Sequence, residues 1–478
     1  MVFGFSHSHK DKEMEKEKHP STLPRSDSSS ESDLETATVK TDDVFGVITE
    51  DGPNYRNVGW LGTTVLLIKS QIGVGVLSVP STLAVLGIVP GIICLWVISA
   101  IICWSDYVVG QFKVKHPQVY GIDDVGKLLF KGKIGRDVIA VMYWLFMTCV
   151  AASGLLGISI GLNAISSHGT CTAVFVAVAT IVTFFLSCIQ TLGKISWLGW
   201  VGLVSIMSAL LTLTIAVGVQ ERPATAPQDG AWDKGLVIWG QPTFTEAITA
   251  VSALVFAFTG TPAFFGIVSE MRDQRKYTQS MLLSQSFVTA VDTVVGVVVY
   301  YYCGQFVASP ALGSAGGTLK KVCYGLALPG LFVTAMMFTH LPAKFLFVRL
   351  LRGSKHLTNN SPKHYIVWVS CVLGCLLFSY VIASAIPVFD GIASLVGALF
   401  GTVLCIQLMA GMWLYDNWER RTTDKTILYK FLLFWNIFVI ALGSFLMVAG
   451  TYGAVIDIKD SYAANQGAGA WSCRDNSS

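Results

Sequence analysis

Stretches of mostly apolar residues, each long enough to cross a bilayer, recur along this chain of 478 residues from Val58 onward. A transmembrane helix needs about 20 apolar residues. The segments are too long for the strands of a β-barrel and lack their alternating pattern. We therefore expect an all-α polytopic membrane protein with eleven transmembrane helices. The predicted spans are 58–86, 91–112, 137–163, 173–189, 198–219, 247–267, 281–306, 330–350, 365–386, 392–414 and 431–456.

The composition excludes several classes of protein. Hydrophobic residues make up 53% of the chain and charged residues only 13%, whereas a soluble globular chain is about one quarter charged. The net charge of +3 favours no polyanionic partner such as nucleic acid. We find no metal-ligand spacing, no nucleotide-binding loop and no repeated pore motif. We therefore expect neither an enzyme nor a channel, and no cofactor.

The positions of Lys and Arg predict the orientation in the membrane. With the N-terminus in the cytoplasm, the inner segments carry 25 of the 33 Lys and Arg residues, counting Arg349 at the inner end of the eighth span, and the outer segments carry 6. Cytoplasmic loops are enriched in these residues. We expect a cytoplasmic N-terminal tail over residues 1–57, a transmembrane domain over 58–456 and a short outer C-terminal tail over 457–478.

The N-terminal tail is polar and is predicted to be disordered. Its serines in residues 26–33 are flanked by acidic residues, and residues 9–19 are rich in lysine. One interpretation is a regulatory tail that a kinase and a ubiquitin ligase modify. The alternative is a solvated leader without a specific role, and the sequence does not separate the two.

Three of the eleven cysteines fall on the outer side in this topology, namely Cys171, Cys323 and Cys473. We predict one disulfide among them. Three pairings are possible, and Cys171 with Cys323 is the candidate pair. Three free thiols are the alternative.

Two of the predicted helices are interrupted. In the first, Gly73 and Gly75 flank Val74, and Pro80 follows; in the sixth, Gly260 precedes Pro262 by two residues. In a helix interior Gly costs roughly 1 kcal/mol and Pro about 3 kcal/mol. Non-helical backbone at membrane depth persists where it lines a cavity or is buried in protein. A kink with close helix packing is the alternative for either helix alone.

The two interruptions occupy matching positions five helices apart. Because five is odd, the two units they begin have opposite membrane orientations, as in transporters built from inverted repeats. We expect repeat one over 58–219, repeat two over 247–414 and an extra helix over 431–456. Free N–H groups at the first break suit a carboxylate. Carbonyls at Phe258 and Thr259, in the second break, suit an ammonium group. The two breaks together therefore suit an α-amino acid.

These residues also carry a family resemblance. Residues 66–80, LLIKSQIGVGVLSVP, resemble the first-helix motif of the amino acid/auxin permease family. Residues 256–277, FAFTGTPAFFGIVSEMRDQRKY, are similar to its sixth-helix segment, most of all in fungal neutral amino acid permeases. The resemblance covers residues 57–452 and not the tails. It implies a LeuT-type fold with five-plus-five inverted repeats and secondary active uptake of amino acids.

The resemblance also implies a substrate site. Gly73, Val74 and Gly75 would bind the substrate carboxylate. Phe258, Thr259 and Gly260 would bind its amino group. No carboxylate lies in the breaks, so nothing there favours a cationic side chain. We expect neutral aliphatic or aromatic L-amino acids, mainly through the resemblance.

Charged and titratable residues inside spans mark functional sites by default, and they predict the coupling ion. Lys69 lies one turn before Gly73. Sodium-coupled relatives have an asparagine at the matching position, and proton-coupled relatives typically have lysine. A fixed ammonium would take the place and charge of sodium, so we expect H⁺ rather than Na⁺. The alternative is that Lys69 snorkels to the cytoplasmic interface.

Histidine titrates near neutral pH, so His340 is a second candidate for ion coupling; a histidine hydrogen-bonded between helices is its alternative. Lys344 is expected to reach the inner interface beside Arg349. For the acidic residues Asp106 and Asp292, a structural pair with a cation or hydroxyl is the favoured role.

The resulting hypothesis is a proton-coupled symporter of neutral L-amino acids that works by alternating access. We expect it in the plasma membrane, with amino acid and lipid as its partners. A vacuolar exporter of the same family and a nutrient-sensing transceptor are the alternatives.

Overall fold

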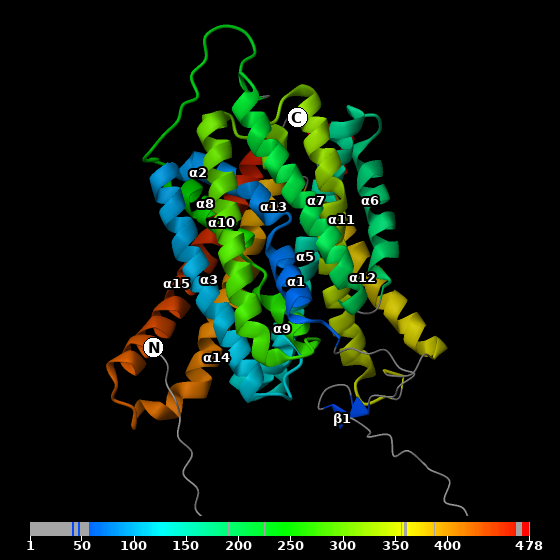
Figure 1. Ribbon diagram of the computed structural model, residues 1–478, viewed down its shortest axis with the longest axis vertical. Coiled ribbons are helices and arrows are strands. Elements are labelled where there is room, and N and C mark those ends of the chain that lie inside the picture. The colour runs from blue at the N-terminus through cyan, green and yellow to red at the C-terminus, as the bar shows by residue number, and fades with distance from the viewer. Residues whose placement is uncertain are drawn as a thin grey trace, which may run out of the picture. The chain divides into compact units, whose positions relative to one another are not determined.

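The computed structural model describes residues 41–42, 46–47, 57–189, 192–223, 225–354, 356–357, 361–386, 388–464 and 471–477. Nearly all of the predicted N-terminal tail, with its serine and lysine clusters, lies outside the described residues. Its described part is a two-stranded antiparallel ladder of β1 (Thr41–Asp42) and β2 (Gly46–Val47). From Asn57 onward the described chain is almost entirely helical (Figure 1).

The main helices follow the predicted spans in order. They are α1 (Trp60–Gln71), α2 (Val79–Leu86), α3 (Ile88–Lys115), α4 (Ile122–Leu129), α5 (Lys133–Ser166), α6 (Thr172–Ser187), α7 (Leu192–Val219), α8 (Phe244–Ala257), α9 (Thr261–Ser269), α10 (Tyr277–Cys303), α11 (Gly317–Leu351), α12 (Pro362–Ala385), α13 (Phe389–Val396), α14 (Leu408–Asn417) and α15 (Ile427–Ala464). Short 3₁₀ segments adjoin them, namely η1 (Gly75–Ser78), η2 (Gln274–Lys276), η3 (Gly304–Phe306), η4 (Ala311–Ser314) and η6 (Trp418–Arg421).

Ten helical segments of the described chain are long and apolar enough to cross a membrane. The predicted span 173–189 corresponds to α6, which is apolar but has only 16 residues. About ten spanning helices are therefore supported, and the eleventh stays a prediction. The last helix, α15, continues to Ala464, beyond the end of the predicted span at residue 456.

The two interrupted helices lie inside the bundle. In an apolar stretch of 18 residues within each, 94% of the residues are buried in the first (Trp60–Leu86) and 89% in the second (Phe244–Ser269), against 22% in α15. In Figure 1, α1 lies near the centre, whereas α15 and α6 lie toward opposite sides. Because unpaired backbone groups are costly in lipid, broken helices belong in the interior, surrounded by unbroken ones.

Two elements were not expected from the sequence. The short helix α4 lies between the second and third long helices and carries Asp123 and Asp124 in its first turn. Between α13 and α14 the chain forms an 11-residue π-helix, η5 (Gly397–Gln407). π-Helical turns are rare in proteins, and those that occur often lie at functional sites.

The disulfide joins Cys171 to Cys473, whose Cα atoms lie 4.4 Å apart. Cys323 is a free, buried thiol within α11, so the candidate pair Cys171 and Cys323 was wrong. The chain around Cys473 lies against the α5–α6 turn, where Thr172 donates to the Arg474 carbonyl at 2.5 Å. Docking of a C-terminal segment onto a turn some 300 residues earlier is a tertiary event that cysteine spacing does not encode.

Candidate functional site

The first break leaves backbone donors exposed to the interior. Helix α1 ends at Gln71, residues 72–74 form a turn, and η1 begins at Gly75. No hydrogen-bond acceptor for the N–H groups of Gly73 and Val74 occurs among the described residues. Both residues are buried. Unpaired buried donors of this kind are suited to an anionic group.

The second break separates α8 from α9 and leaves a backbone acceptor. Residues 258–260 form a turn in which Gly260 N–H donates to the Phe258 carbonyl at 2.8 Å. The Thr259 hydroxyl donates to the Phe256 carbonyl at 2.6 Å. The Thr259 carbonyl has no backbone donor among the described residues. The Thr259 carbonyl is therefore a better acceptor for an ammonium group than the Phe258 carbonyl, which already accepts a hydrogen bond from Gly260.

Two glycines bring the breaks into direct contact. A Cβ atom on Gly75 would lie 2.7 Å from the Ala257 Cα atom, and one on Gly260 would lie 2.7 Å from the Ser70 hydroxyl and the Gln71 side chain. Real Cβ contacts are longer, so only glycine permits this approach. The structure thus places side by side the two breaks that contain the six residues predicted for the substrate site: Gly73, Val74, Gly75, Phe258, Thr259 and Gly260.

Lys69 lies beside the first break and does not snorkel to an interface. The side chain is fully buried, and its Nζ donates to the Ile72 carbonyl at 3.1 Å and to the Thr334 hydroxyl of α11 at 2.5 Å. Its aliphatic stem passes Gly202 of α7, where a Cβ would lie 3.0 Å from the Lys69 Cε atom. The Lys69 amino group therefore occupies the space between the break, α7 and α11.

The second break is enclosed by α3 and η5, which sequence reasoning did not connect with it. A Cβ on Gly401 of η5 would lie 2.7 Å from the Thr259 Cγ2 atom. Asp106 of α3 is fully buried, and the Thr261 hydroxyl faces its carboxyl without a hydrogen bond of good geometry. Neither oxygen of Asp106 accepts a hydrogen bond of good geometry among the described residues, so the expected pair with a cation or hydroxyl stays a prediction, with Thr261 as its candidate hydroxyl.

Asp292 of α10 is likewise buried, and neither of its carboxyl oxygens has a partner among the residues with described positions. The pairing expected for Asp292 is not found among these residues and stays a prediction. Sequence could indicate that both carboxyls lie at membrane depth. It could not indicate what each carboxyl faces.

The hydrogen bond between helices that was one of the two interpretations of His340 stays a prediction, because the ring faces the backbone of Ser187 and Ile189 at the end of α6. Its ring is fully buried and packs edge-on against Trp368 of α12, with 5.1 Å between ring centroids. Neither ring nitrogen makes a hydrogen bond of good geometry among the described residues. Lys69 binds Thr334 of α11. His340 lies six residues further along the same helix.

Lys344 forms an ion pair with Glu270, directly after the end of α9. The two side chains are 3% and 1% exposed, so the expectation that Lys344 reaches the interface beside Arg349 was wrong. The chain around Glu270 also meets the segment before α1. Val58 N–H donates to the Glu270 carbonyl at 3.1 Å, and Arg272 N–H donates to the Val58 carbonyl at 2.9 Å. These contacts tie the start of α1 to the end of α9.

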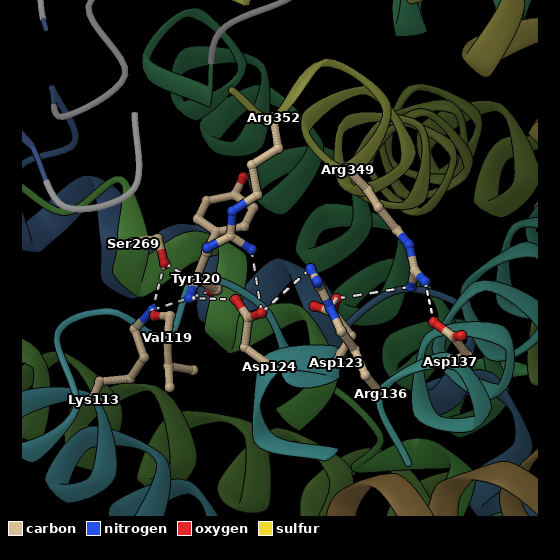
Figure 2. A network of polar contacts seen from close by, with 10 residues as sticks. All are labelled: Lys113, Val119, Tyr120, Asp123, Asp124, Arg136, Asp137, Ser269, Arg349 and Arg352. Carbon is tan, nitrogen blue, oxygen red and sulfur yellow. Dashed lines mark hydrogen bonds and ion pairs between the residues drawn. The ribbon is translucent and has the colours of Figure 1, made fainter. Parts of the chain in front are cut away.

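A network of charged side chains lies at this same end of the molecule, and we call it the polar network (Figure 2). It comprises Lys113, Asp123, Asp124, Arg136, Asp137, Ser269, Arg349 and Arg352, together with the backbone of residues 119 and 120. Lys113 of α3 donates to the Tyr120 carbonyl at 3.1 Å and to the Ser269 hydroxyl at 2.5 Å. This lysine therefore attaches the last residue of α9 to the turn before α4.

The acidic residues of α4 hold the ends of α5 and α11 in the polar network. Arg136 Nε lies 2.9 Å from an Asp123 oxygen, and Arg352 Nη1 lies 3.3 Å from an Asp124 oxygen. Burial raises the pKa of Asp123 and the adjacent Asp124 raises it further, while Arg136 opposes both effects. The arginines thus supply the counter-charge that lets two neighbouring carboxylates lie half-buried or deeper.

Comparison with known proteins identifies the family. Residues 56–456 match the family described as "Transmembrane amino acid transporter protein". The chain belongs to this family. The transporter is 32% identical over 430 residues to the "N amino acid transport system protein" of Neurospora crassa, with 89% of this chain and 90% of the relative covered. It is 30% identical over 429 residues to a "Transmembrane transporter" of Fusarium pseudograminearum, covering 89% of each chain.

The fold of the transporter is similar to that of MhsT, solved in complex with L-phenylalanine. The TM-score is 0.56 at 14% identity, and the match covers 82% of this chain and 98% of MhsT. The expected relationship to the amino acid/auxin permeases is confirmed, as is a LeuT-like helical fold. The protein is a multi-pass membrane protein that transports amino acids, and its family is not one of enzymes.

Proposed function

We propose that the transporter is a proton-coupled symporter of neutral L-amino acids that works by alternating access. The observation that carries the coupling is the position of Lys69. Its ammonium is held by a carbonyl at the first break and a hydroxyl of α11, which are oxygen ligands of the kind that hold a sodium ion in transporters with broken helices. With the Lys69 ammonium there, this position leaves neither room nor charge for sodium.

The substrate is bound in this proposal between the two breaks. The unpaired N–H groups of Gly73 and Val74 receive its carboxylate, and the Thr259 carbonyl receives its ammonium. No acidic side chain belongs to the six residues of the two breaks, and Phe258 is fully buried beside them. A neutral side chain suits these surroundings, and MhsT, whose fold is similar, is solved in complex with L-phenylalanine.

Alternating access is the expected cycle because the two broken helices begin matching units of the chain. Repeat one runs over 58–219 and repeat two over 247–414, with opposite orientations. With the N-terminus in the cytoplasm, the polar network and the Lys344–Glu270 pair lie on the cytoplasmic side. They tie α1, α9 and α11 together, which corresponds to a state closed toward the cytoplasm. Opening on that side requires these contacts to break.

The plasma membrane is the proposed location, with uptake as the direction. A vacuolar exporter of the same family uses the same site with the opposite net flux. Fluorescent tagging of the full chain distinguishes the two membranes directly.

The decisive experiment is uptake of labelled amino acids into proteoliposomes under an imposed gradient of pH or of sodium. We expect an inward pH gradient alone to drive accumulation of neutral amino acids, and Lys69→Ala to abolish that accumulation. Accumulation that requires sodium, or full pH-driven accumulation by Lys69→Ala, would contradict the proposal. Matched uptake of lysine or aspartate would contradict the neutral specificity.

A further inference from the structure

The start of α9 faces a buried carboxyl that has no counter-charge among the described residues. Asp106 is fully buried in α3, and neither of its oxygens has a hydrogen-bond partner there. The side chain facing it from α9 is Thr261, the first residue of that helix. A single buried carboxylate without a partner is among the costliest groups in a protein interior, so its presence beside a helix break calls for a functional explanation.

The groups around Asp106 supply no positive side chain. The titratable groups that face it are the Cys103 thiol of its own helix, the Tyr277 hydroxyl of α10 and the Cys405 thiol of η5. Tyr277 donates to the Asp106 backbone carbonyl at 3.0 Å and not to the carboxyl. No Lys, Arg or His forms an ion pair with this carboxyl in the described part of the chain. The partner left for a negative charge is the N-terminal end of α9.

Helix α9 can carry the effect of that charge to the far side of the site. It has nine residues and so a length of about 13 Å, and its N-terminal end carries a partial positive charge. Its other end leads into Ser269 and Glu270, which are held by Lys113 and Lys344. A change of charge at Asp106 therefore acts on one end of a rod whose other end is fastened to the polar network.

We propose that Asp106 is the residue that takes up and releases the coupled proton, and that its charge controls the position of α9. This rests on the proposed proton-coupled function. One proton from the outer solution binds the carboxylate to give the neutral acid, and the acid returns that proton to the cytoplasm. Each cycle then moves one zwitterionic substrate and one positive charge. The ionised carboxylate attracts the start of α9, and the neutral acid releases it.

The test compares Asp106→Asn with Asp292→Asn, because both residues are buried carboxyls on long helices without partners among the described residues. In proteoliposomes we expect Asp106→Asn to lose at least about tenfold in accumulation driven by a pH gradient. Counterflow, the exchange of labelled for unlabelled substrate at equal pH, should persist and become independent of pH between about 5.5 and 7.5. Accumulation by Asp292→Asn should still follow the pH gradient.

The outcomes separate this inference from the function on which it rests. If the unmodified transporter accumulates substrate under a pH gradient and Asp106→Asn does so equally, the inference is overturned and the proposed function stands. If Asp292→Asn loses coupling to the same extent, the assignment to Asp106 is overturned. If the unmodified transporter shows no pH-driven accumulation, both fail.

A conservative variant covers the case in which Asp106→Asn does not reach the membrane. Asp106→Glu keeps the carboxyl and moves it by one methylene. We expect it to retain pH-driven accumulation with a shifted external pH for half-maximal uptake. An unchanged pH profile for a well-expressed Asp106→Glu would overturn the inference, because a purely structural role would alter expression without moving this profile.

Discussion

The two ends of α9 lie in contrasting electrostatic surroundings. At its start, Asp106 is buried without a hydrogen bond of good geometry among the described residues. At its far end, Glu270 pairs with Lys344, and the acidic residues of the polar network face arginines. Both regions bury carboxyls. They differ in whether a cation accompanies each one.

The contrast indicates two different uses of buried charge. A paired carboxyl is expensive to disturb, because loss of either partner leaves a buried charge alone. An unpaired carboxyl can change its charge by binding a proton, with no ion pair to break. The ion pairs at the far end of α9 therefore hold the helix in place, whereas the charge at its start can vary.

The largest effect on stability is expected at the ion pair of Lys344 and Glu270. Lys344→Met leaves the Glu270 carboxyl buried without its ammonium, and we expect a loss of about 3 to 5 kcal/mol in unfolding free energy. The double variant Lys344→Met with Glu270→Met removes both charges and should recover most of that loss. Thermal unfolding in detergent measures both. A single variant as stable as the unmodified protein would remove the distinction between the two ends.

Gly73→Val tests the break itself. The first added atom, Cβ, would lie 2.7 Å from the Thr334 hydroxyl and 3.3 Å from the Lys69 Nζ atom. We expect uptake to fall at least about tenfold while the protein still reaches the membrane. Gly325→Val on α11 is the matched control, because no atom lies within 4 Å of its Cβ position. Normal uptake by Gly73→Val would refute the placement of the substrate site.

Arg136→Gln tests the polar network through pH. Its guanidinium is 24% exposed, so we expect a loss of only about 1 kcal/mol at neutral pH. The pKa of Asp123 is raised in the folded state, so its ionised form opposes folding and its own contribution to stability falls as pH rises through that range. Arg136 offsets this effect only while the carboxyls are ionised. The difference between variant and unmodified protein should therefore shrink on acidification, and denaturation at several pH values measures it.

The smallest effect is expected for Asp292→Leu, which should raise the free energy of unfolding rather than lower it. An apolar side chain of similar size replaces a buried carboxyl whose oxygens lack partners in the described structure, so we expect a gain of about 1 kcal/mol in stability. Thermal unfolding again provides the measurement. Destabilisation would indicate that Asp292 has a partner and belongs with the paired group.

Much of the fold was predictable because its signals are local in the chain. Apolar length placed the helices, and Gly73, Gly75, Gly260 and Pro262 placed the two breaks. The π-helix η5 was not predictable, because its residues 397–407 have the same apolar composition as an ordinary transmembrane helix. Helix α4 was missed because eight residues with two acidic side chains are typical of a loop.

Partners of individual residues needed the tertiary structure. The expectation that Lys69 stands beside the break came from its position one turn before Gly73, but its partner Thr334 lies 265 residues away. Lys344 was assigned to the interface because a lysine near a helix end usually snorkels. It stays buried because Glu270, 74 residues earlier, supplies a counter-charge.

The sequence by itself determined the class of protein, the positions of the helices, the two breaks and the residues that flank them. These follow from hydrophobic length and backbone chemistry, which act over a few turns of one helix. Only the tertiary structure decided that the breaks touch, that Cys171 pairs with Cys473, and which buried charges have partners. A helix that is apolar on all sides carries no pattern that says which neighbour each face will meet, so charge pairing is settled by packing alone.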